Sequence, residues 1–221
     1  MENLLIKNRA VLFANGTIAD LQQVRRLIHP EDLLLAVDGG TRLVRSIGLV
    51  PSAIIGDLDS LATEDKNWAS TAGARMIEYP RDKNETDLEL ALAYALAQGA
   101  TEILLVGALG GRTDQALGNL ALLTDHRFSH LGVRLDDGVE EVWFVRSTSV
   151  IQGDTGDIVS LLPWGGPVTG VSTEGLRWSL HSETLYPEKT RGISNEMLDH
   201  SAYVSIQSGL LLIVHRRDHH S

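Results

Sequence analysis

The sequence predicts an α/β protein of two parts: an N-terminal three-layer α/β domain with a mainly parallel sheet, followed by an all-β C-terminal sandwich domain. Two observations predict this fold class. In the first half, short continuous apolar runs alternate with helical patterns, as they do in buried parallel strands joined by helices. In the second half, strand-like runs follow one another directly, separated by turns rich in Gly, Pro, Asp and Ser.

Five segments read as the strands of the parallel sheet, and four of them are short continuous apolar runs; the five cover 10–14, 33–37, 53–55, 75–79 and 103–106. The segments between them have helical spacing, which predicts helices over 18–28, 41–47, 63–72, 86–98 and 114–123. Gly99 follows the fourth of these helices, where a glycine commonly ends a helix.

The second half contains seven shorter strand-like runs, at 139–145, 149–151, 157–162, 168–172, 177–180, 202–207 and 210–215. Their spacing is typical of a small antiparallel sandwich. Because the periodicity changes between residues 127 and 132, we expect a catalytic domain at 1–129 and a sandwich domain at 130–221.

Composition excludes several classes of function. The 19 Lys and Arg residues against 29 Asp and Glu give a net charge of −10, which repels phosphate backbones, so we expect no nucleic-acid partner. The absence of cysteine excludes disulfides, thiolate metal sites and cysteine nucleophiles. No apolar stretch approaches the roughly 18–20 residues that span a bilayer, and the first ten residues lack a signal-peptide pattern, so we expect no membrane partner and a cytoplasmic location.

The chemistry-bearing residues follow the predicted strands. Ligands of open parallel sheets bind at the carboxyl ends of the strands. Four consecutive strand ends carry acids and glycines: Asp38-Gly39-Gly40, Gly56-Asp57-Leu58-Asp59-Ser60, the 81–87 segment and the 107–115 segment. We expect these four segments to converge on one edge of the sheet.

Asp57 and Asp59 are two residues apart, so in extended backbone their side chains point the same way. Two adjacent carboxylates repel each other unless a cation neutralises them, and hard oxygen ligands favour Mg²⁺. The alternative is a polar turn in which Asp59 or Ser60 caps the helix that begins near residue 62.

The other two segments suit phosphate. Lys83 is a point charge for a phosphate, with a solvated lysine as the alternative, while Thr86 and Asp87 suit the start of a helix. The 107–115 segment joins a strand to a helix through three glycines and Arg112, which lets the backbone approach a phosphate; a tight structural turn is the alternative. It matches neither the Walker P-loop nor the dinucleotide fingerprint.

Trp178 is the residue of interest in the second half. Its ring offers a flat surface for an aromatic or cationic ligand, although a tryptophan beside a strand is more often a core residue. We expect Trp143 and Trp164 to pack within the sandwich and Trp68 to pack on a helix.

Taken in order, these motifs resemble the thiamine pyrophosphokinase family, whose members make thiamine diphosphate from thiamine and ATP. The resemblance covers nearly the whole chain, and the pair Gly56-Asp57-Leu58-Asp59-Ser60 and Gly110-Gly111-Arg112-Thr113-Asp114 is its most specific part. The other matching elements are Asp38-Gly39-Gly40, the 83–87 run with the helix it opens, Gln115 with Asn119, Gly175 to Leu180, and Gly192 to Glu196.

The resemblance implies a homodimer whose active site lies between the catalytic domain of one subunit and the sandwich of the other. It implies Mg²⁺ at Asp38, Asp57, Asp59 and Asp87, with ATP as co-substrate at Gly39, Lys83, Gly110, Gly111, Arg112 and Gln115. It implies thiamine at Trp178, Ser194 and Asn195, and catalytic roles for Asp59, Asp87, Asp114 and Arg112. An Asp often follows the lysine in this family, and because Asn84 stands there we assign that position no charged role.

Three alternatives stay open at this point. A pyrophosphokinase for another heteroaromatic alcohol, such as a hydroxymethylpterin, would keep the acidic site but need different groups around Trp178. A nucleotide-sugar transferase would use Asp57-Leu58-Asp59 as its D-x-D element. In a non-enzymatic module, the same acids would serve only as caps and turns.

Overall fold

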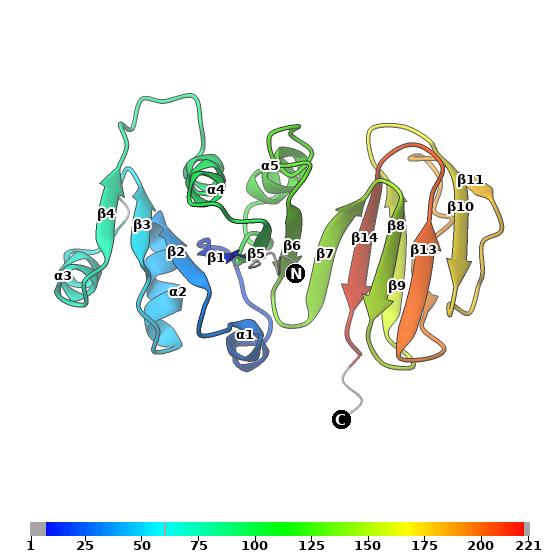
Figure 1. Cartoon of the computed structure of the whole chain (residues 1–221), viewed down its shortest axis with the longest axis horizontal. Coiled ribbons are helices and arrows are strands. Elements are labelled where there is room, and N and C mark those ends of the chain that lie inside the picture. Colours follow the sequence, from blue (N-terminus) through cyan, green and yellow to red (C-terminus); the bar gives the residue numbers. More distant parts are fainter. Residues whose placement is uncertain (1–7, 60, 219–221) are drawn as a thin grey trace, which may run out of the picture. The chain divides into compact units, whose positions relative to one another are not determined.

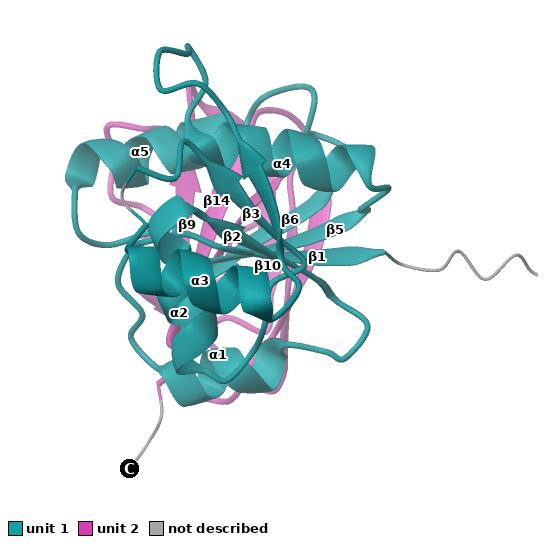
Figure 2. Cartoon of the chain, turned by 90° about the vertical axis from the view of Figure 1, so that its left-hand side faces the viewer, with its two compact units in different colours: residues 1–138 teal, residues 139–221 magenta. Residues whose placement is uncertain are grey.

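A computed structural model describes residues 8–59 and 61–218, which form two compact units divided between Gly138 and Val139 (Figures 1 and 2). Unit 1 is an α/β domain on a parallel sheet, and unit 2 is built of antiparallel strands. The predicted fold class is confirmed. The division lies beyond the 129/130 boundary expected from sequence because one further strand belongs to unit 1.

The sheet of unit 1 has six parallel strands in the order β6-β5-β1-β2-β3-β4. Their bounds are β1 Arg9–Phe13, β2 Leu33–Val37, β3 Ala53–Gly56, β4 Arg75–Glu78, β5 Glu102–Val106 and β6 Gly132–Asp136. All five strands predicted for this sheet are present, and β6 was not predicted. Because β1 lies between β2 and β5, the strand order reverses beside β1, and such a switch point is where open α/β sheets bind ligands.

Helices cover both faces of this sheet, with α4 and α5 on one face and α1, α2 and α3 on the other (Figures 1 and 2). Their bounds are α1 Leu21–Leu27, α2 Thr41–Ser46, α3 Thr63–Thr71, α4 Asp87–Ala97 and α5 Thr113–Leu122, with a short 3₁₀ turn at Asp38–Gly40. All five predicted helices are confirmed. The Thr86 hydroxyl caps α4 by accepting the N–H of Glu89 at 3.2 Å, and Gly99 ends the helix region with a φ of +86°.

Unit 2 contains two antiparallel sheets, β12-β9-β14-β7 and β11-β10-β13-β8. Their bounds are β7 Glu140–Val145, β8 Thr148–Gln152, β9 Ile158–Pro163, β10 Val168–Glu174, β11 Glu183–Leu185, β12 Asn195–Glu196, β13 Ser201–Ser205 and β14 Leu211–Arg216. One apolar core takes side chains from both sheets, among them Ile213 and Val171, which confirms the sandwich. The strand predicted at 177–180 is wrong, since that segment is a turn beside the bridge of Leu176 with Met197.

Trp143 and Trp68 pack as expected, and Trp164 packs outside the sandwich core. Trp143 is buried in the sandwich core, and its indole N–H donates to the Ser149 hydroxyl at 3.0 Å. Trp164 meets Phe144 edge to face, with ring centroids 5.4 Å apart. Trp68 packs against the apolar core of unit 1.

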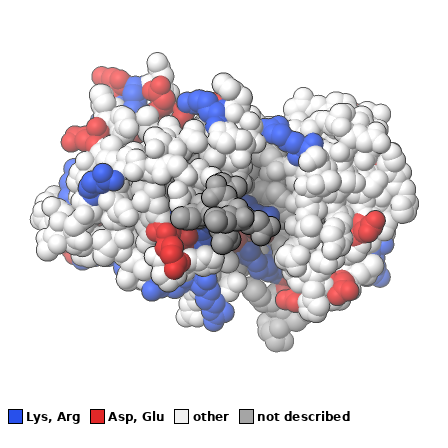
Figure 3. Space-filling model, viewed as in Figure 1, with Lys and Arg blue, Asp and Glu red and all other residues white. Residues whose placement is uncertain are grey.

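The described surface carries both signs of charge. On the face drawn in Figure 3, Lys and Arg side chains are interspersed with Asp and Glu side chains rather than gathered in one band. Within residues 8–59 and 61–218, no helix has the length and apolar character needed to cross a bilayer.

A buried hydrogen-bonded pair, Asp157 and His215, joins the end of β14 to the loop before β9. The Asp157 carboxylate lies 2.8 Å from Nε2 of His215 and accepts the backbone N–H groups of Asp154 at 3.0 Å and Asp218 at 2.8 Å. Burial of this carboxyl opposes its charge, but these partners outweigh the burial and hold the pKa of Asp157 below its ordinary value.

We expect Asp157→Ala to lower the free energy of unfolding by about 3 kcal/mol, because it leaves buried donors without their acceptor. Asp154→Ala is the matched control, since it removes only an exposed pair with His200, and it should cost far less. Urea unfolding at neutral pH measures both values.

The same pair makes a prediction about pH. Since the folded pKa of Asp157 is depressed, its stabilising contribution is present above roughly pH 4 and is lost as the pH falls further, so the gap between wild type and Asp157→Ala should narrow at pH 3. Equal losses in Asp157→Ala and Asp154→Ala would contradict this account.

Candidate active site

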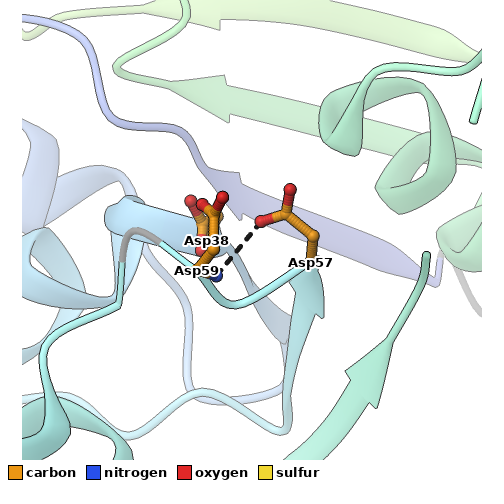
Figure 4. Close-up of side chains that lie close together, drawn as sticks. All are labelled: Asp38, Asp57 and Asp59. Atoms are coloured by element: carbon orange, nitrogen blue, oxygen red, sulfur yellow. Dashed lines mark hydrogen bonds between the residues drawn. The ribbon is translucent and has the colours of Figure 1, made fainter. Parts of the chain in front are cut away.

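Three carboxylates meet at the carboxyl ends of β2 and β3. One oxygen each from Asp38, Asp57 and Asp59 lies within 4.8 Å of the others, and Figure 4 shows the three groups gathered beside the turn that follows β3. Asp87, the first residue of α4, borders this cluster. Gly56 has a φ of +153°, and a Cβ placed on it would lie 3.1 Å from the Asp38 Cβ and 3.3 Å from the Asp87 Cγ, so a larger residue would be strained and would crowd these two acids.

The backbone that positions Asp57 and Asp59 is a tight turn, not the extended chain expected from their spacing. Leu58 has a φ of +59°, and the backbone N–H of Asp59 donates to Oδ1 of Asp57 at 3.1 Å. Asp38 also has a positive φ, of +44°. Left-handed conformations are costly for residues other than glycine, and they gather where a site needs its side chains aimed.

The capping alternative is wrong for Asp59. The N-cap of α3 is Ala62, and no side chain caps that helix through a hydrogen bond. Ser60, the other capping candidate, lies outside the described residues. The Asp59 carboxylate therefore does not cap α3. It lies near the carboxylate of Asp38 and the guanidinium of Arg81.

The electrostatics of the cluster favour a bound cation. Burial raises the pKa of Asp38, and the charges of Asp87 and Asp57 raise it further. The backbone N–H of Asp59 instead lowers the pKa of Asp57 and keeps that carboxylate ionised. A divalent cation relieves this repulsion, and an all-oxygen donor set is the kind that Mg²⁺ takes.

Two cations from the loop between β4 and α4 face the acids. Nζ of Lys83 lies 2.9 Å from Oδ1 of Asp87, and the Arg81 guanidinium lies 3.4 Å from Asp59. The Lys83 side chain is only 12% exposed, so the solvated-lysine alternative is wrong. A cavity of about 370 Å³ is lined by Lys83 and Arg81 together with three of the four acids, Asp38, Asp57 and Asp87. Arg81 was not selected as a site residue from the sequence. Like Lys83, it is a basic residue that follows the fourth predicted strand, and that position could have identified it.

A second cavity, of about 450 Å³, adjoins the first at the switch point beside β1. Its walls are the glycine-rich segment after β5 and the 14–17 loop after β1, and it shares Asn15, Gln115 and Asn119 with the acidic cavity. The two loops touch closely, since a Cβ on Gly16 would lie 2.3 Å from the carbonyl oxygen of Gly107. The sequence reasoning missed Asn15 and its neighbours because that strand end carries no charge.

The predicted phosphate-side residues occupy both cavities. Gly39 lines the acidic cavity, Gly110, Gly111 and Arg112 line the glycine-rich one, and Gln115 lines both. Arg112 is exposed and pairs with Asp114 at 2.5 Å. The hydrogen bond from Arg112 lowers the pKa of Asp114, which lines neither cavity. Asp114 therefore lies apart from the acidic cluster and holds Arg112 at the rim.

Unit 2 has a cavity of about 500 Å³, lined by Trp178 and residues 190–195. The core alternative for Trp178 is wrong, because half of this side chain (50%) is exposed. The Arg177 guanidinium lies over the indole, 5.3 Å from its centroid. Ser194 and Asn195 also line the cavity, and Ser194 has a φ of +57°. An exposed indole beside a cavity is suited to stacking on a flat ring.

Family comparisons agree with this division of the chain. Residues 24–135 match the family model described as thiamin pyrophosphokinase, catalytic domain, and residues 148–211 match the model described as thiamin pyrophosphokinase, vitamin B1 binding domain. The catalytic-domain match alone covers half of the 221 residues.

Curated relatives and solved structures carry the same name. The thiamine pyrophosphokinase of Bacillus subtilis is 28% identical over 188 residues, covering 84% of this chain and 88% of the relative. Thiamine pyrophosphokinase 1 of Oryza sativa subsp. japonica is 28% identical over 179 residues, covering 76% and 67%. The crystal structure of the Bacillus subtilis protein superimposes with a TM-score of 0.85 at 24% identity, covering 96% of this chain and 100% of that one, which shows the shared fold. The matches in both halves together show that this chain belongs to the thiamine pyrophosphokinase family.

Proposed function

We propose that this protein transfers the diphosphoryl group of ATP to the hydroxyl group of thiamine, giving thiamine diphosphate and AMP. The observation that carries the proposal is the acidic cluster with Lys83 at its side, opening into a glycine-lined cavity, in a chain that also matches a vitamin B1 binding domain. The pterin and nucleotide-sugar alternatives, and a non-enzymatic module, find no support in the family comparisons.

Asp38, Asp57, Asp59 and Asp87 are the residues that would hold Mg²⁺. Bound there, the ion would neutralise phosphate charge and supply electrophilic assistance to the transfer. The close grouping of the Asp38, Asp57 and Asp59 carboxylates supports this assignment, because carboxylates so close repel one another unless a cation lies between them, and the pKa of Asp38 is raised accordingly.

The nucleotide side of the site is built to hold phosphates. Backbone N–H groups around Gly110 and Gly111, at the start of the ten-residue helix α5, suit phosphate oxygens, and Gly39 and Gln115 extend this surface into the acidic cavity. Lys83 and Arg112 supply positive charge toward the groups being transferred.

In the reaction, the hydroxyl oxygen of thiamine bonds to the β-phosphorus of ATP. The bond from that phosphorus to the oxygen shared with the α-phosphate breaks, and AMP leaves with that oxygen. Catalysis of this kind depends on positioning and on neutralising oxyanion charge. We assign Asp59 and Asp87 to orienting the hydroxyl group and accepting its proton, because Asp87 lines the acidic cavity and Asp59 lies within 4.8 Å of Asp38 and Asp57, which also line it. Asp114 orients Arg112 through their ion pair.

Thiamine carries an aromatic pyrimidine and a cationic thiazolium ring, and the cavity of unit 2 offers the chemistry to bind them. The half-exposed indole of Trp178 suits stacking and cation–π attraction, with Ser194 and Asn195 beside it. The match of residues 148–211 to a vitamin B1 binding domain supports this assignment.

The proposal includes a homodimer in which the catalytic domain of one subunit completes its site with the sandwich of the other. Its support is the family resemblance.

A complementation experiment tests the shared site. Asp59→Asn disables the acidic cluster, and Trp178→Ala weakens the thiamine side. If sites are shared, a mixed dimer of the two variants contains one intact site of two. Random exchange of equal amounts makes about half of the dimers mixed, so it should restore activity toward about a quarter of that of wild type at low thiamine. Activity no greater than the sum of the separate variants would contradict shared sites.

The activity itself is tested by following AMP and thiamine diphosphate together, with Mg²⁺-ATP present and with thiamine added or omitted. We expect equal amounts of both products, only with thiamine, and none after EDTA. Asp59→Asn should lower turnover at least ~100-fold, as loss of a positioned ligand commonly does, and Asp154→Asn, a carboxylate exposed on unit 2, should leave it unchanged. Thiamine-independent AMP release, or none at all, would contradict the proposed function.

A further inference from the structure

We propose that Asn195 is a positioning residue, which fixes the main chain of Trp178 so that the indole is held ready for thiamine, and that it is not itself a thiamine ligand. The inference rests on the proposed function, because it takes the Trp178 cavity as the thiamine side. Asn195 lines that cavity, and the resemblance implied that it contacts thiamine; the inference assigns it a positioning role instead.

The hydrogen bonds of the Asn195 side chain carry the argument. Its Oδ1 accepts the backbone N–H of Trp178 at 3.0 Å, and its Nδ2 donates to the Trp178 carbonyl oxygen at 2.8 Å. The amide therefore pairs with both backbone groups of one residue, as a neighbouring β-strand would. Oδ1 also accepts the backbone N–H of Glu196 at 2.9 Å.

These bonds leave Asn195 little capacity for a ligand. An asparagine amide has two donor hydrogens and an oxygen that accepts two bonds. Both acceptor positions and one donor are in use, and only 3% of the residue is exposed. Trp178 is the opposite case, since half of its side chain is exposed and available for contact.

The neighbours of Asn195 hold the same segment. The N–H of Arg177 donates to the Glu196 carbonyl and the N–H of Leu198 donates to the Gly175 carbonyl, both at 2.9 Å. The Glu196 carboxylate also pairs with the Arg177 guanidinium at 2.9 Å, and that guanidinium lies over the Trp178 ring. The 195–198 segment thus fixes the Trp178 backbone and the cation that covers one face of its indole.

An exposed indole on a turn stacks well only if its backbone is already fixed, because ordering it on binding costs affinity. Residues 177–180 form no strand, so no strand pairing holds the backbone of Trp178 in place. The Asn195 side-chain amide holds it instead, by hydrogen bonding both the N–H and the carbonyl oxygen of Trp178. The amide is required on chemical grounds, since a carboxylate at 195 would turn an oxygen toward the Trp178 carbonyl.

The test is the equilibrium affinity for thiamine without nucleotide, measured by calorimetry for Asn195→Ala, Trp178→Ala and the double variant. We expect each single variant to weaken binding at least about tenfold, and the double variant to bind no more than about twofold weaker than Trp178→Ala, because Asn195 acts through Trp178. If the fold-loss of thiamine affinity in the double variant equals the product of the two single losses, the proposal is overturned. Unchanged thiamine affinity in Asn195→Ala would also overturn it.

Two further variants distinguish loss of Trp178 positioning from a general destabilisation of unit 2. Asn195→Asp, which has nearly the same shape, should lose affinity as Asn195→Ala does; wild-type affinity in it would overturn the proposal. Ser149→Ala is the matched control, because it removes a side-chain acceptor from the indole N–H of a different tryptophan, Trp143, and it should leave thiamine affinity unchanged.

Acrylamide quenching of tryptophan fluorescence provides a readout that needs no thiamine. The difference in quenching between wild type and Trp178→Phe is the component that comes from Trp178. We expect Asn195→Ala to change this Trp178 component and Ser149→Ala to leave it unchanged. If wild-type protein fails to bind thiamine, the proposed function fails, and a changed quenching component still supports the positioning of Trp178 by Asn195. An unchanged component in Asn195→Ala would overturn it.

Discussion

The structure around the candidate active site depends on the repulsion between carboxylates that the sheet brings together. Parallel pairing of β2 with β3 sets Asp38 beside the turn of Asp57 and Asp59, and α4 adds Asp87. Gly56 leaves the space this requires, and left-handed backbone at Asp38 and Leu58 aims the side chains. Lys83 and Arg81 offset part of the negative charge, and a divalent cation would offset the rest.

Much of the fold follows from local pattern. Four strands of unit 1, β1, β2, β3 and β5, are largely buried, so they read as continuous apolar runs, and the helices lie in the segments between the strands. β6 was not predicted because Gly132 to Asp136 lacks the continuous apolar run that marks most of the other strands of unit 1, although it pairs with β5. The 177–180 segment reads as a strand, yet its backbone groups bond to the 195–198 segment and to the Asn195 side chain instead.

The candidate site was predictable where it depends on charged residues at strand ends. The four acids, Lys83 and the glycine-rich segment all line or border the two cavities of unit 1. Contacts between distant segments were not predictable. The approach of the 14–17 loop to Gly107 and the pairing of Asn195 with Trp178 arise from tertiary folding, and no spacing in the sequence encodes them.

The central claim is that the acidic cluster exists to hold a divalent cation, and thermal unfolding with and without Mg²⁺ tests it most directly. A ligand that binds the folded chain and not the unfolded chain raises the melting temperature, and the stabilisation grows with ln(1 + L/Kd), where L is the free ligand concentration. The account predicts a rise on adding millimolar Mg²⁺ that disappears in Asp57→Asn/Asp59→Asn and persists in Asp154→Asn. A wild-type melting temperature insensitive to Mg²⁺, or a rise of the same size in Asp57→Asn/Asp59→Asn, would contradict it.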